Sequence, residues 1–370
     1  MASGRTANGL FFEKTDPGLP KISVLMAVFN EEKVILQKLE SLAAVDYPEE
    51  KWHVFIGSDC STDTTNAIVM GFEARMPNLH FFPFEKRRGK PPVINELADF
   101  ARKMHPFEPS HVLLLTDASV MLAENAVFEL AKHFKNPKIG VVDAQIAGTG
   151  LREAGISRSE NQYMSREIAL KNHESRALGM MMGPFGGCFA VRSDLFAPIP
   201  PNSLVDDFWL TMQVLNKGFS AISEPKARCT EGATHAVGDE YRRKKRIAAG
   251  SFQNLARFKN LVLPPGSWLG FVFFSHKVLR WFGGFLMLAA WVAAFFLMGK
   301  NWFYAASFWA MTAGFLGVPA LDFLFKTLKI NWLPVRSLAY FILMNIALMD
   351  GFFKYIRGVR TNIWTPTKRY

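Results

Sequence analysis

The sequence has little of what marks a secreted protein built on disulfides. Its 370 residues include only three cysteines, Cys60, Cys188 and Cys229. Their wide spacing forms neither a disulfide framework nor a zinc-binding pattern, and it suits a reducing compartment. The first 20 residues contain no apolar run of the length that a secretory signal needs. We therefore expect the N-terminal part of the chain not to be exported.

Common nucleotide-binding signatures are also missing. The sequence has no Walker A loop and no Gly-x-Gly-x-x-Gly motif, so P-loop enzymes and Rossmann dehydrogenases have no support. It also has no Asn-x-Ser/Thr acceptor. Basic residues nevertheless outnumber acidic ones by 43 to 32, for a formal net charge of +11. This excess favours an anionic partner such as a nucleotide phosphate, a lipid headgroup or a nucleic acid. Charge alone does not choose among them.

Apolar residues are concentrated in the C-terminal third, and this shift marks a domain boundary. Three apolar stretches there approach the length of about 20 residues with which a helix crosses a bilayer; they are 281–298, 302–325 and 337–353. A buried core helix is the alternative for each one, but three of them flanked by Trp and Tyr favour membrane insertion. Residues 268–279 mix aromatic and basic side chains, which predicts a helix lying in the membrane interface.

The first 150 residues alternate strand-like and helical patterns. We expect strands at 21–28, 53–58, 79–83, 111–116 and 139–147, and helices at 31–44, 62–75, 92–104 and 124–134. This order builds an α/β fold with a mostly parallel, Rossmann-type sheet and helices on both faces. Further on we expect helices at 157–174, 204–218 and 239–259, and a glycine-rich apolar stretch at 180–191.

Polar clusters follow three of the expected strands. They are Asn30-Glu31-Glu32, residues 59–63 and Asp117-Ala118-Ser119. In open α/β sheets ligands bind outside the carboxyl ends of the strands, so these clusters should line one crevice. A helix N-cap is the alternative for any single cluster. Because Asp59 and Asp117 each directly follow an apolar strand, we favour a binding site.

Further motifs follow in a fixed order along the chain. They are the segment 24–31, the segment 57–65, the basic loop 85–90, the run 113–119 with Asp117, the acid pair within 204–210, and the basic segment 241–247. In this order and spacing the chain resembles family 2 glycosyltransferases of the GT-A fold. The likeness is to membrane-bound bacterial polysaccharide synthases of the cellulose, hyaluronan and poly-N-acetylglucosamine synthase type. It covers about residues 21–257, and the ending Trp364-Thr365-Pro366-Thr367 is also similar.

The resemblance implies a nucleotide site at the strand ends. It assigns nucleotide binding to Asn30, Glu31, Asp59, Arg88, Lys90, Asp117, Arg243 and Arg246. A carboxylate such as Asp59 can accept hydrogen bonds from a base N–H or a ribose hydroxyl, and Arg and Lys neutralise a diphosphate. A solvated loop is the alternative for the basic run at 85–90.

The resemblance also implies a divalent cation, Mg²⁺ or Mn²⁺, as cofactor. Its ligands would be Asp117 and Ser119, with His235 as a further metal or phosphate contact. Hard cations prefer oxygen ligands, and a cation stabilises the leaving diphosphate. Ser119 stands where the family has its second aspartate, which leaves Asp117 as the stronger ligand.

On the acceptor side the resemblance makes Asp207 the catalytic base and Asp206 the residue that orients it. A sugar hydroxyl is a poor nucleophile at neutral pH, so inverting transfer needs a base within hydrogen-bond reach. An acid pair favoured by the helix dipole is the alternative. In the segment 241–247, Arg243 replaces the motif's Gln and Ile247 its Trp, so processive polymerisation is less secure than transfer. A basic helix facing anionic lipid is the alternative for that segment.

These observations predict an inverting glycosyltransferase of the inner membrane, with several membrane passes and a cytoplasmic catalytic domain. It would take a nucleotide-sugar donor and a glycan or lipid-linked acceptor, would contact membrane lipids, and would need no nucleic acid. Exopolysaccharide or cell-envelope glycan synthesis and a single transfer to a polyprenyl phosphate or lipid-linked oligosaccharide both remain open. A membrane-tethered nucleic-acid-binding module is the non-enzymatic alternative. The expected divisions are 1–20, 21–260 (catalytic), 261–280 (interfacial), 281–356 (transmembrane) and 357–370 (basic tail).

Overall fold

The computed structural model describes residues 11–106, 110–149, 156–232, 237–262, 266–330 and 332–359. The chain forms two compact units. Among the described residues, the first unit runs to Thr149 and resumes over Glu167–Gly232, and we call it the sheet unit. The second, the helical unit, takes the remainder up to Val359. His235 and the tail motif at 364–367 lie outside the described residues.

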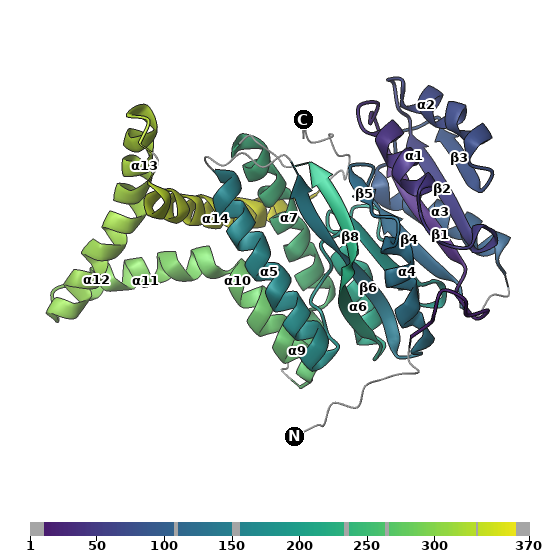
Figure 1. Cartoon of the computed structure of the whole chain (residues 1–370). Coiled ribbons are helices and arrows are strands. Elements are labelled where there is room, and N and C mark those ends of the chain that lie inside the picture. Colours follow the sequence, from purple (N-terminus) through teal and green to yellow (C-terminus); the bar gives the residue numbers. More distant parts are fainter. Residues whose placement is uncertain are drawn as a thin grey trace. The chain divides into compact units, whose positions relative to one another are not determined.

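The sheet unit is built on one eight-stranded sheet with the order β3-β2-β1-β4-β7-β6-β8-β5 (Figure 1). Its strands are β1 (Ile22–Val28), β2 (Trp52–Asp59), β3 (Leu79–Phe84), β4 (Val112–Thr116), β5 (Val120–Leu122), β6 (Ile139–Thr149), β7 (Cys188–Arg192) and β8 (Ser220–Gly232). The first four strands in chain order are parallel, β7 is antiparallel to β4 and β6, β8 is parallel to β6, and β5 is antiparallel to β8. The predicted α/β fold with a mostly parallel sheet is confirmed.

Helices cover both faces of this sheet. They are α1 (Ile35–Ala43), α2 (Thr65–Phe72), α3 (Lys90–Met104), α4 (Ala126–Ala131), α5 (Ile156–Leu178) and α6 (Asp206–Asn216). Alternate residues of β1, such as Val24 and Met26, pack in one core with residues of α1 and α4. On the other face, a Cβ at Gly57 of β2 would collide with Val93 of α3. The alternation in β1 follows from the two-residue period of a strand.

The expected elements differ from the structure mainly at their ends. Helix α1 begins four residues later than predicted, while α3 begins at Lys90, two residues earlier. Three strands, β5, β7 and β8, were not predicted. Strand β7 lies at the end of the glycine-rich apolar stretch, to which we assigned no secondary structure. Strand β5 has only three residues, and β8 carries Pro225 and several charged side chains that hide its strand pattern. Both belong to the edge of the sheet that carries Glu231.

The helical unit contains α7 (Val237–Arg257), α8 (Lys259–Val262), α9 (Trp268–Phe273), α10 (Leu279–Trp281), α11 (Gly283–Leu297), α12 (Trp302–Thr312), α13 (Val318–Thr327) and α14 (Leu333–Ile356). One π-turn, Phe274–Val278, joins α9 to α10, and another, Ala313–Gly317, joins α12 to α13. Two continuous helices, Trp302–Thr327 and Leu333–Ile356, are long and apolar enough to cross a membrane. The bent pair Trp268–Trp281 and Gly283–Leu297, with an angle of 63°, would make a third crossing if it forms one span.

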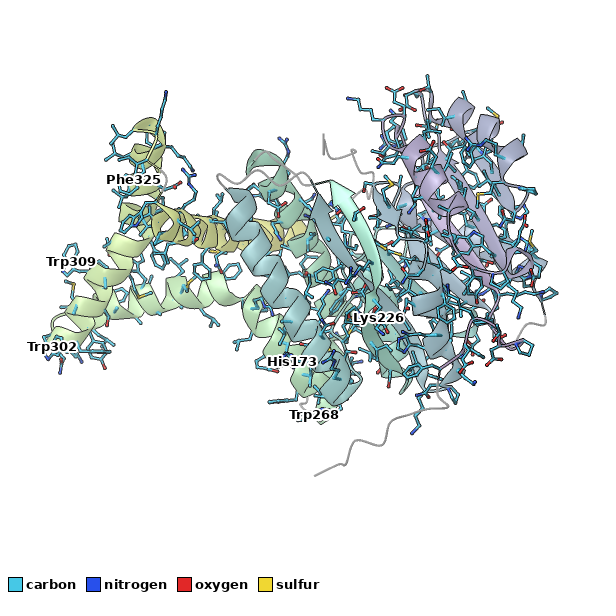
Figure 2. All side chains as sticks on the ribbon, in the orientation of Figure 1. His173, Lys226, Trp268, Trp302, Trp309 and Phe325 are labelled. Carbon is cyan, nitrogen blue, oxygen red and sulfur yellow. The ribbon has the colours of Figure 1, made fainter. Side chains whose placement is uncertain are left out.

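Exposed aromatic side chains cover the candidate spans. Trp302 is 79% exposed and Trp309 is 61% exposed, and both lie on α12 (Figure 2). The only acid between Trp302 and Thr327 is Asp322, which pairs with Lys326 and with Arg336 Nε at 3.7 Å. An apolar surface of this kind and a neutralised charge both suit a lipid environment.

Helix α7 is fixed to α14 by polar contacts and by close packing. The Tyr241 hydroxyl donates to Asp350 Oδ2 at 2.9 Å, and Lys245 Nζ donates to the same oxygen at 2.8 Å. A Cβ on Gly351 would collide with Ala248, so the two helices approach closely here. Part of the basic run in α7 therefore serves packing between helices.

Candidate active site

The turns after β1 and β2 are hydrogen-bonded to each other. Asn30 Oδ1 accepts from the Thr62 N–H at 2.8 Å, and the Glu31 N–H donates to Thr65 Oγ1 at 2.8 Å. Asn30 and Cys60 both adopt positive φ angles, 52° and 62°. Such conformations are uncommon outside glycine and often mark functional sites. The first two predicted nucleotide-binding segments thus form one joined surface at the carboxyl ends of the strands.

Asp59 is the last residue of β2 and is fully buried. Its two carboxylate oxygens accept the N–H groups of Arg88 and Gly89, at 2.7 and 2.8 Å. A pair of backbone donors on one carboxylate is a strong, charge-assisted arrangement. Asp59 therefore fixes the start of α3, where Lys90 is the first residue.

Lys90 lies between two other predicted site residues, Asp117 and Asp206. Its Nζ donates to Asp117 Oδ1 at 2.7 Å and lies 3.6 Å from Asp206 Oδ2. Burial alone would lower the pKa of Lys90, but the negative charges of Asp117, Asp206 and Asp207 outweigh it and raise that pKa. Lys90 is therefore a permanent cation between the strand end of β4 and the start of α6.

Asp206 and Asp207 begin α6. Burial and the neighbouring charge of Asp206 raise the pKa of Asp207 to about 6, although the charge of Lys90 opposes this. A carboxylate with such a pKa is a competent general base near neutral pH. The two acids also lie in the first turn of the helix, where the helix dipole stabilises their negative charges.

Ser119 has an acidic partner that we did not predict. Its Oγ donates to Glu231 Oε1 at 2.8 Å, and Glu231 comes from β8. The register pairs Val120 of β5 with Glu231, so the short strand β5 brings the two residues together. A carboxylate is therefore present beside the position where the second aspartate of the family motif is replaced by Ser119.

A buried lysine lies beneath the turn that carries Asp117. Lys38 of α1 is 0% exposed; its Nζ donates to Thr116 Oγ1 at 2.9 Å and to the carbonyl of Val120. These two acceptors flank the turn at Asp117-Ala118-Ser119. Burial lowers the pKa of Lys38 to about 8, against the opposing charges of Cys188, Cys229 and Asp117.

The other predicted basic residues have neighbours of their own or belong to the helical unit. Arg88 Nη1 pairs with Glu96 at 2.8 Å, and its guanidinium lies over the Phe84 ring at 4.2 Å. Arg243 and Arg246 lie on α7 in the helical unit, where Arg243 contacts Glu240 at 3.4 Å. These positions leave their assignment to the diphosphate as a prediction.

A metal site is only partly formed by protein side chains. Among the described residues, no group of three or more His, Cys, Asp or Glu could hold a metal ion. The ammonium of Lys90 nevertheless binds Asp117, and the negative charges of Asp117, Asp206 and Asp207 stabilise its charged form. A positive charge is therefore already held at this position. Mg²⁺ and Mn²⁺ sites of transferases usually take several ligands from substrate phosphates and water, so these residues fit such an ion.

Residues important for the site escaped sequence reasoning because their partners are distant in the chain. Glu231 is 112 residues from Ser119, and Lys38 is 78 residues from Thr116. Asp143 of β6 is fully buried and also had no assigned role. A fully buried Lys or Asp is rare unless paired, but burial cannot be seen in the sequence.

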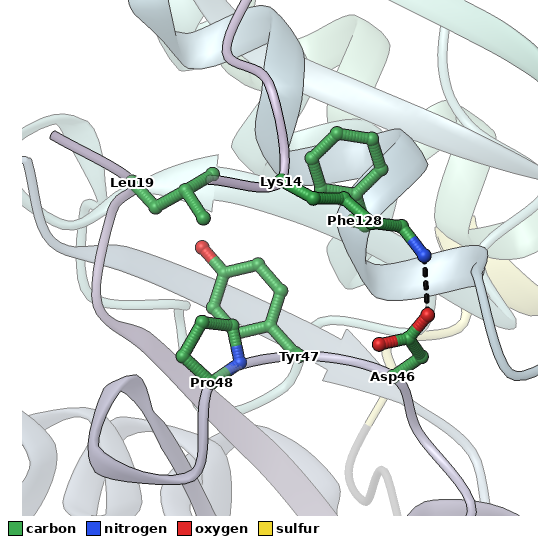
Figure 3. Close-up of a pocket in the computed structure, with 6 residues that line it drawn as sticks. All are labelled: Lys14, Leu19, Asp46, Tyr47, Pro48 and Phe128. Carbon is green, nitrogen blue, oxygen red and sulfur yellow. Dashed lines mark hydrogen bonds and ion pairs between the residues drawn. The ribbon is translucent and has the colours of Figure 1, made fainter. Parts of the chain in front are cut away.

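A cavity of about 280 Å³ lies away from this group. Its walls are Lys14, Leu19, Asp46, Tyr47, Pro48 and Phe128 (Figure 3). The Tyr47 hydroxyl donates to the Pro20 carbonyl at 2.6 Å, which explains this ring's position by packing. None of the predicted site residues lines the cavity.

Comparison with known sequences places the chain in a family. A profile of glycosyl transferase family 2 matches residues 23–197, and a profile of glycosyl transferase family group 2 matches residues 111–354, more than half of the chain. The chain is 24% identical over 251 residues to the beta-monoglucosyldiacylglycerol synthase of Nostoc sp. (strain PCC 7120), covering 66% of this chain and 52% of that protein. It is 26% identical over 250 residues to the poly-beta-1,6-N-acetyl-D-glucosamine synthase of Staphylococcus epidermidis, covering 64% and 56%. The chain thus matches about half the length of these relatives.

The fold has a counterpart among solved structures. The mannosyltransferase PcManGT from Pyrobaculum calidifontis, in complex with GDP-Man and Mn²⁺, aligns with a TM-score of 0.63 at 21% identity. The alignment covers 91% of this chain and 87% of that one. At this identity the likeness establishes the fold. Together with the profile matches, it makes the chain a member of the family 2 glycosyltransferases with a GT-A-like fold.

Proposed function

We propose that this protein is an inverting glycosyltransferase that moves a sugar from a nucleotide-sugar donor to a glycan or lipid-linked acceptor at a membrane. The observation that carries the proposal is the position of Lys90, 2.7 Å from Asp117 and 3.6 Å from Asp206. This lysine brings the donor motif at the end of β4 beside the acceptor motif at the start of α6. Both halves of a transfer reaction then meet at one place.

The donor half would use the joined turns after β1 and β2. Asn30, Glu31 and Asp59 would bind the nucleoside, either through their own polar atoms or, for Asp59, by fixing the loop before Lys90. Lys90 would neutralise the diphosphate, with Arg88, Arg243 and Arg246 as further cations. Asp117 would hold Mg²⁺ or Mn²⁺, with Ser119, Glu231 and His235 as further oxygen or nitrogen donors. When bound, the ion supplies charge stabilisation for the leaving diphosphate.

The transfer half would use Asp207 as general base. Its carboxylate would accept the proton of the acceptor hydroxyl while that oxygen forms a bond to the sugar's anomeric carbon. The bond from that carbon to the diphosphate breaks, and the nucleoside diphosphate leaves with the electron pair. Attack from the face opposite the leaving group inverts the configuration. The raised pKa of Asp207, about 6, supports this role because the base must be ionised yet basic near neutral pH.

The names of two relatives support an acceptor that is a lipid or a glycan. One similar protein is named as a synthase of a glucosyldiacylglycerol and another as a synthase of an N-acetylglucosamine polymer. Both products belong to the lipid or glycan class that we propose here. Product length after incubation with labelled donor separates single transfer from polymerisation. A ladder of products indicates polymerisation, and one added sugar indicates single transfer.

We also propose a cytoplasmic catalytic domain on the inner membrane, with the C-terminal tail on the same side. Two helices, Trp302–Thr327 and Leu333–Ile356, are long and apolar enough to cross a membrane, and two crossings would return the chain to the side of the catalytic domain. The cluster Lys354 and Arg357 near the end of α14 would then lie inside, as positive residues tend to do. Labelling a C-terminal cysteine from outside intact cells would contradict this arrangement, whereas protection agrees with it.

The function is tested with membranes that contain the full-length protein. They are incubated with a panel of nucleotide sugars and Mn²⁺, and nucleoside diphosphate release is measured. We expect release with one donor or a small group of related donors, and loss of release in an Asp117→Asn variant that remains folded. Membranes in which no donor is turned over above the variant's background would refute the proposal.

A further inference from the structure

Asp143 is a buried carboxyl group that the proposed mechanism does not use. It lies on β6 and is 0% exposed. Its Oδ2 accepts the Phe185 N–H at 3.1 Å, while Oδ1 has no hydrogen-bond partner among the described residues. A buried polar atom without a partner is costly and calls for an explanation.

The segment that Asp143 holds is pressed against the proposed base. Gly186 follows Phe185 and has a φ of +86°. A Cβ at this glycine would collide with the carboxylate of Asp207, so the turn and Asp207 are in contact. Only glycine adopts this conformation easily and also leaves space for the carboxylate.

Helix α5 supports the same turn from another side. Lys171 Nζ lies 3.5 Å from the centre of the Phe185 ring, and Glu174 Oε2 accepts the Met182 N–H at 3.2 Å. Both side chains are nearly fully buried. The turn that contacts Asp207 is therefore held by a strand below it and by a helix beside it.

We propose that Asp143 is a positioning residue for Asp207, acting through the Phe185–Gly186 turn. This inference rests on the proposed role of Asp207 as the base. The hydrogen bond from Phe185 to Asp143 fixes the turn, and the turn fixes the rotamer of the Asp207 carboxylate by contact at Gly186. Asp143 itself need not touch either substrate.

The charges around the two acids make their titrations interdependent. Burial raises the pKa of Asp143 to about 7, with Lys171 lowering it and Asp207 raising it further. The charged and titratable groups that act on the pair are Lys171, Lys90, Asp206, Cys188 and Cys229. Two carboxyl groups that repel each other ionise in successive steps, and here Asp207, which has the lower pKa, ionises first and Asp143 second.

Two substitutions separate the hydrogen bond from the charge. Asp143→Asn keeps an oxygen that can accept from Phe185 but removes the ionisable group. Asp143→Leu removes both. The matched control is Glu224→Gln, because Glu224 is a buried carboxylate on the adjacent strand β8 whose contacts are with His133 and Lys132. The full-length protein is used, with kcat measured from pH 5 to 9 and nucleoside diphosphate affinity measured alongside.

We expect Asp143→Leu to lower kcat about tenfold while donor affinity stays within about twofold, because the turn does not carry the donor motif. Asp143→Asn should keep most of kcat and leave the acid limb, which belongs to Asp207, in place, but it should remove the second step of the pH profile near pH 7, where Asp143 ionises beside the base. Glu224→Gln should keep both steps. A residue that only supports the fold would not remove the second step.

Wild-type kcat in a folded Asp143→Leu variant would overturn the inference, and so would an unchanged second step in the pH profile of Asp143→Asn. If Asp143→Leu does not fold, Asp143→Asn decides alone. A separate Asp207→Asn variant distinguishes failure of the proposed base from failure of the proposed role of Asp143. If it retains turnover, the proposed base is wrong; if it loses turnover while both Asp143 variants match the wild type at every pH, only the role of Asp143 is wrong.

Discussion

The two ends of the parallel strands in the sheet unit differ in whether their basic side chains carry a charge. At the carboxyl ends, the ammonium of Lys90 lies between Asp117 and Asp206 and stays charged. At the amino ends, four histidines form a row: His53, His80, His105 and His111. Ring centres are 5.6 Å apart for His53 and His80, 4.9 Å for His53 and His105, and 5.2 Å for His105 and His111.

Burial keeps two of these histidines neutral. Burial, with the neighbouring His105, His80 and Lys21, lowers the pKa of His53 to about 4, and burial also lowers that of His80. The His53 and His80 rings are therefore neutral at pH 7. Burial thus favours the neutral form of His53 and His80 at the amino ends, whereas neighbouring acids keep Lys90 charged at the carboxyl ends. The diphosphate site that we propose lies at the carboxyl ends, where Lys90 keeps its charge.

Metal removal should have the largest effect, because it takes away the cation that the acids at the carboxyl ends are proposed to hold. Excess EDTA should lower transfer by at least about 10²–10³-fold, since a bound ion contributes several kcal/mol to stabilising the leaving group. Adding Mn²⁺ or Mg²⁺ should restore it. Full activity in EDTA would assign the neutralising role to Lys90 and the arginines alone.

Asp207→Asn should follow, with a loss of about 10²-fold or more in turnover, the scale expected when a positioned base is lost. Asn keeps the size of the side chain but cannot accept the proton. Donor affinity should survive, and Asp206→Asn should be milder because its carboxylate orients and tunes the base. Near-normal turnover in both variants would reduce the acid pair to a helix start.

Lys90→Met should change two affinities in opposite directions. The nucleoside diphosphate should bind about tenfold more weakly, because its closest counter-charge is gone. Mn²⁺ measured without nucleotide should bind more tightly, because Lys90 no longer competes for Asp117 Oδ1. Isothermal titration of each ligand gives both numbers. The control is Lys86→Met, an exposed residue of the same loop, and equal effects of the two variants would contradict a specific role for Lys90.

The fold could be predicted where the sequence is apolar and local. Strands β1 and β4 are buried along their whole length, so each is visible in the sequence as a continuous apolar run. Strand β8 was missed because only four of its 13 residues are buried, one of them the charged Glu224, and Pro225 interrupts the pattern. A strand that packs on one face only gives a weak signal unless its buried residues are large.

The site could be predicted where a motif carries it, and not where pairing between distant strands completes it. Lys90, Asp117 and Asp206 were named from motifs, and the structure brings these three together. Glu231 was not, because its meeting with Ser119 depends on the register of β5 and β8. Arg243 and Arg246 remain predictions, since they lie on α7 in the helical unit.

Asp59→Ala should weaken nucleoside diphosphate binding by about fivefold, the equivalent of about one net hydrogen bond of loop organisation. Both carboxylate oxygens hold the backbone before Lys90, so loss of Asp59 loosens the cation as well as any direct contact with the nucleoside. Asp59→Asn should be impaired too, because one of its two polar atoms becomes a donor facing an N–H. Asp63→Ala, whose carboxylate bonds to Glu32 and Thr65 instead, is the control. Unchanged affinity in Asp59→Ala would remove Asp59 from the site.

The smallest effect belongs to the histidine row, and it concerns stability rather than activity. His53 binds a proton below about pH 6.5 when unfolded but only below about pH 4 when folded. The unfolded state therefore holds more protons between these values, and stability falls as pH drops from 6.5 to 4. Since His53 is partly exposed, the loss should be about 1–2 kcal/mol, or a few degrees in Tm. His53→Phe keeps a ring in the stack and should flatten this acid dependence in thermal unfolding of the full-length protein in detergent, with neutral-pH activity unchanged. His173→Phe, on the exposed side of α5 (Figure 2), is the matched control and should leave the dependence as it is. If His53→Phe loses stability toward pH 4 as steeply as the wild type does, the amino ends do not differ from the carboxyl ends in the way described above.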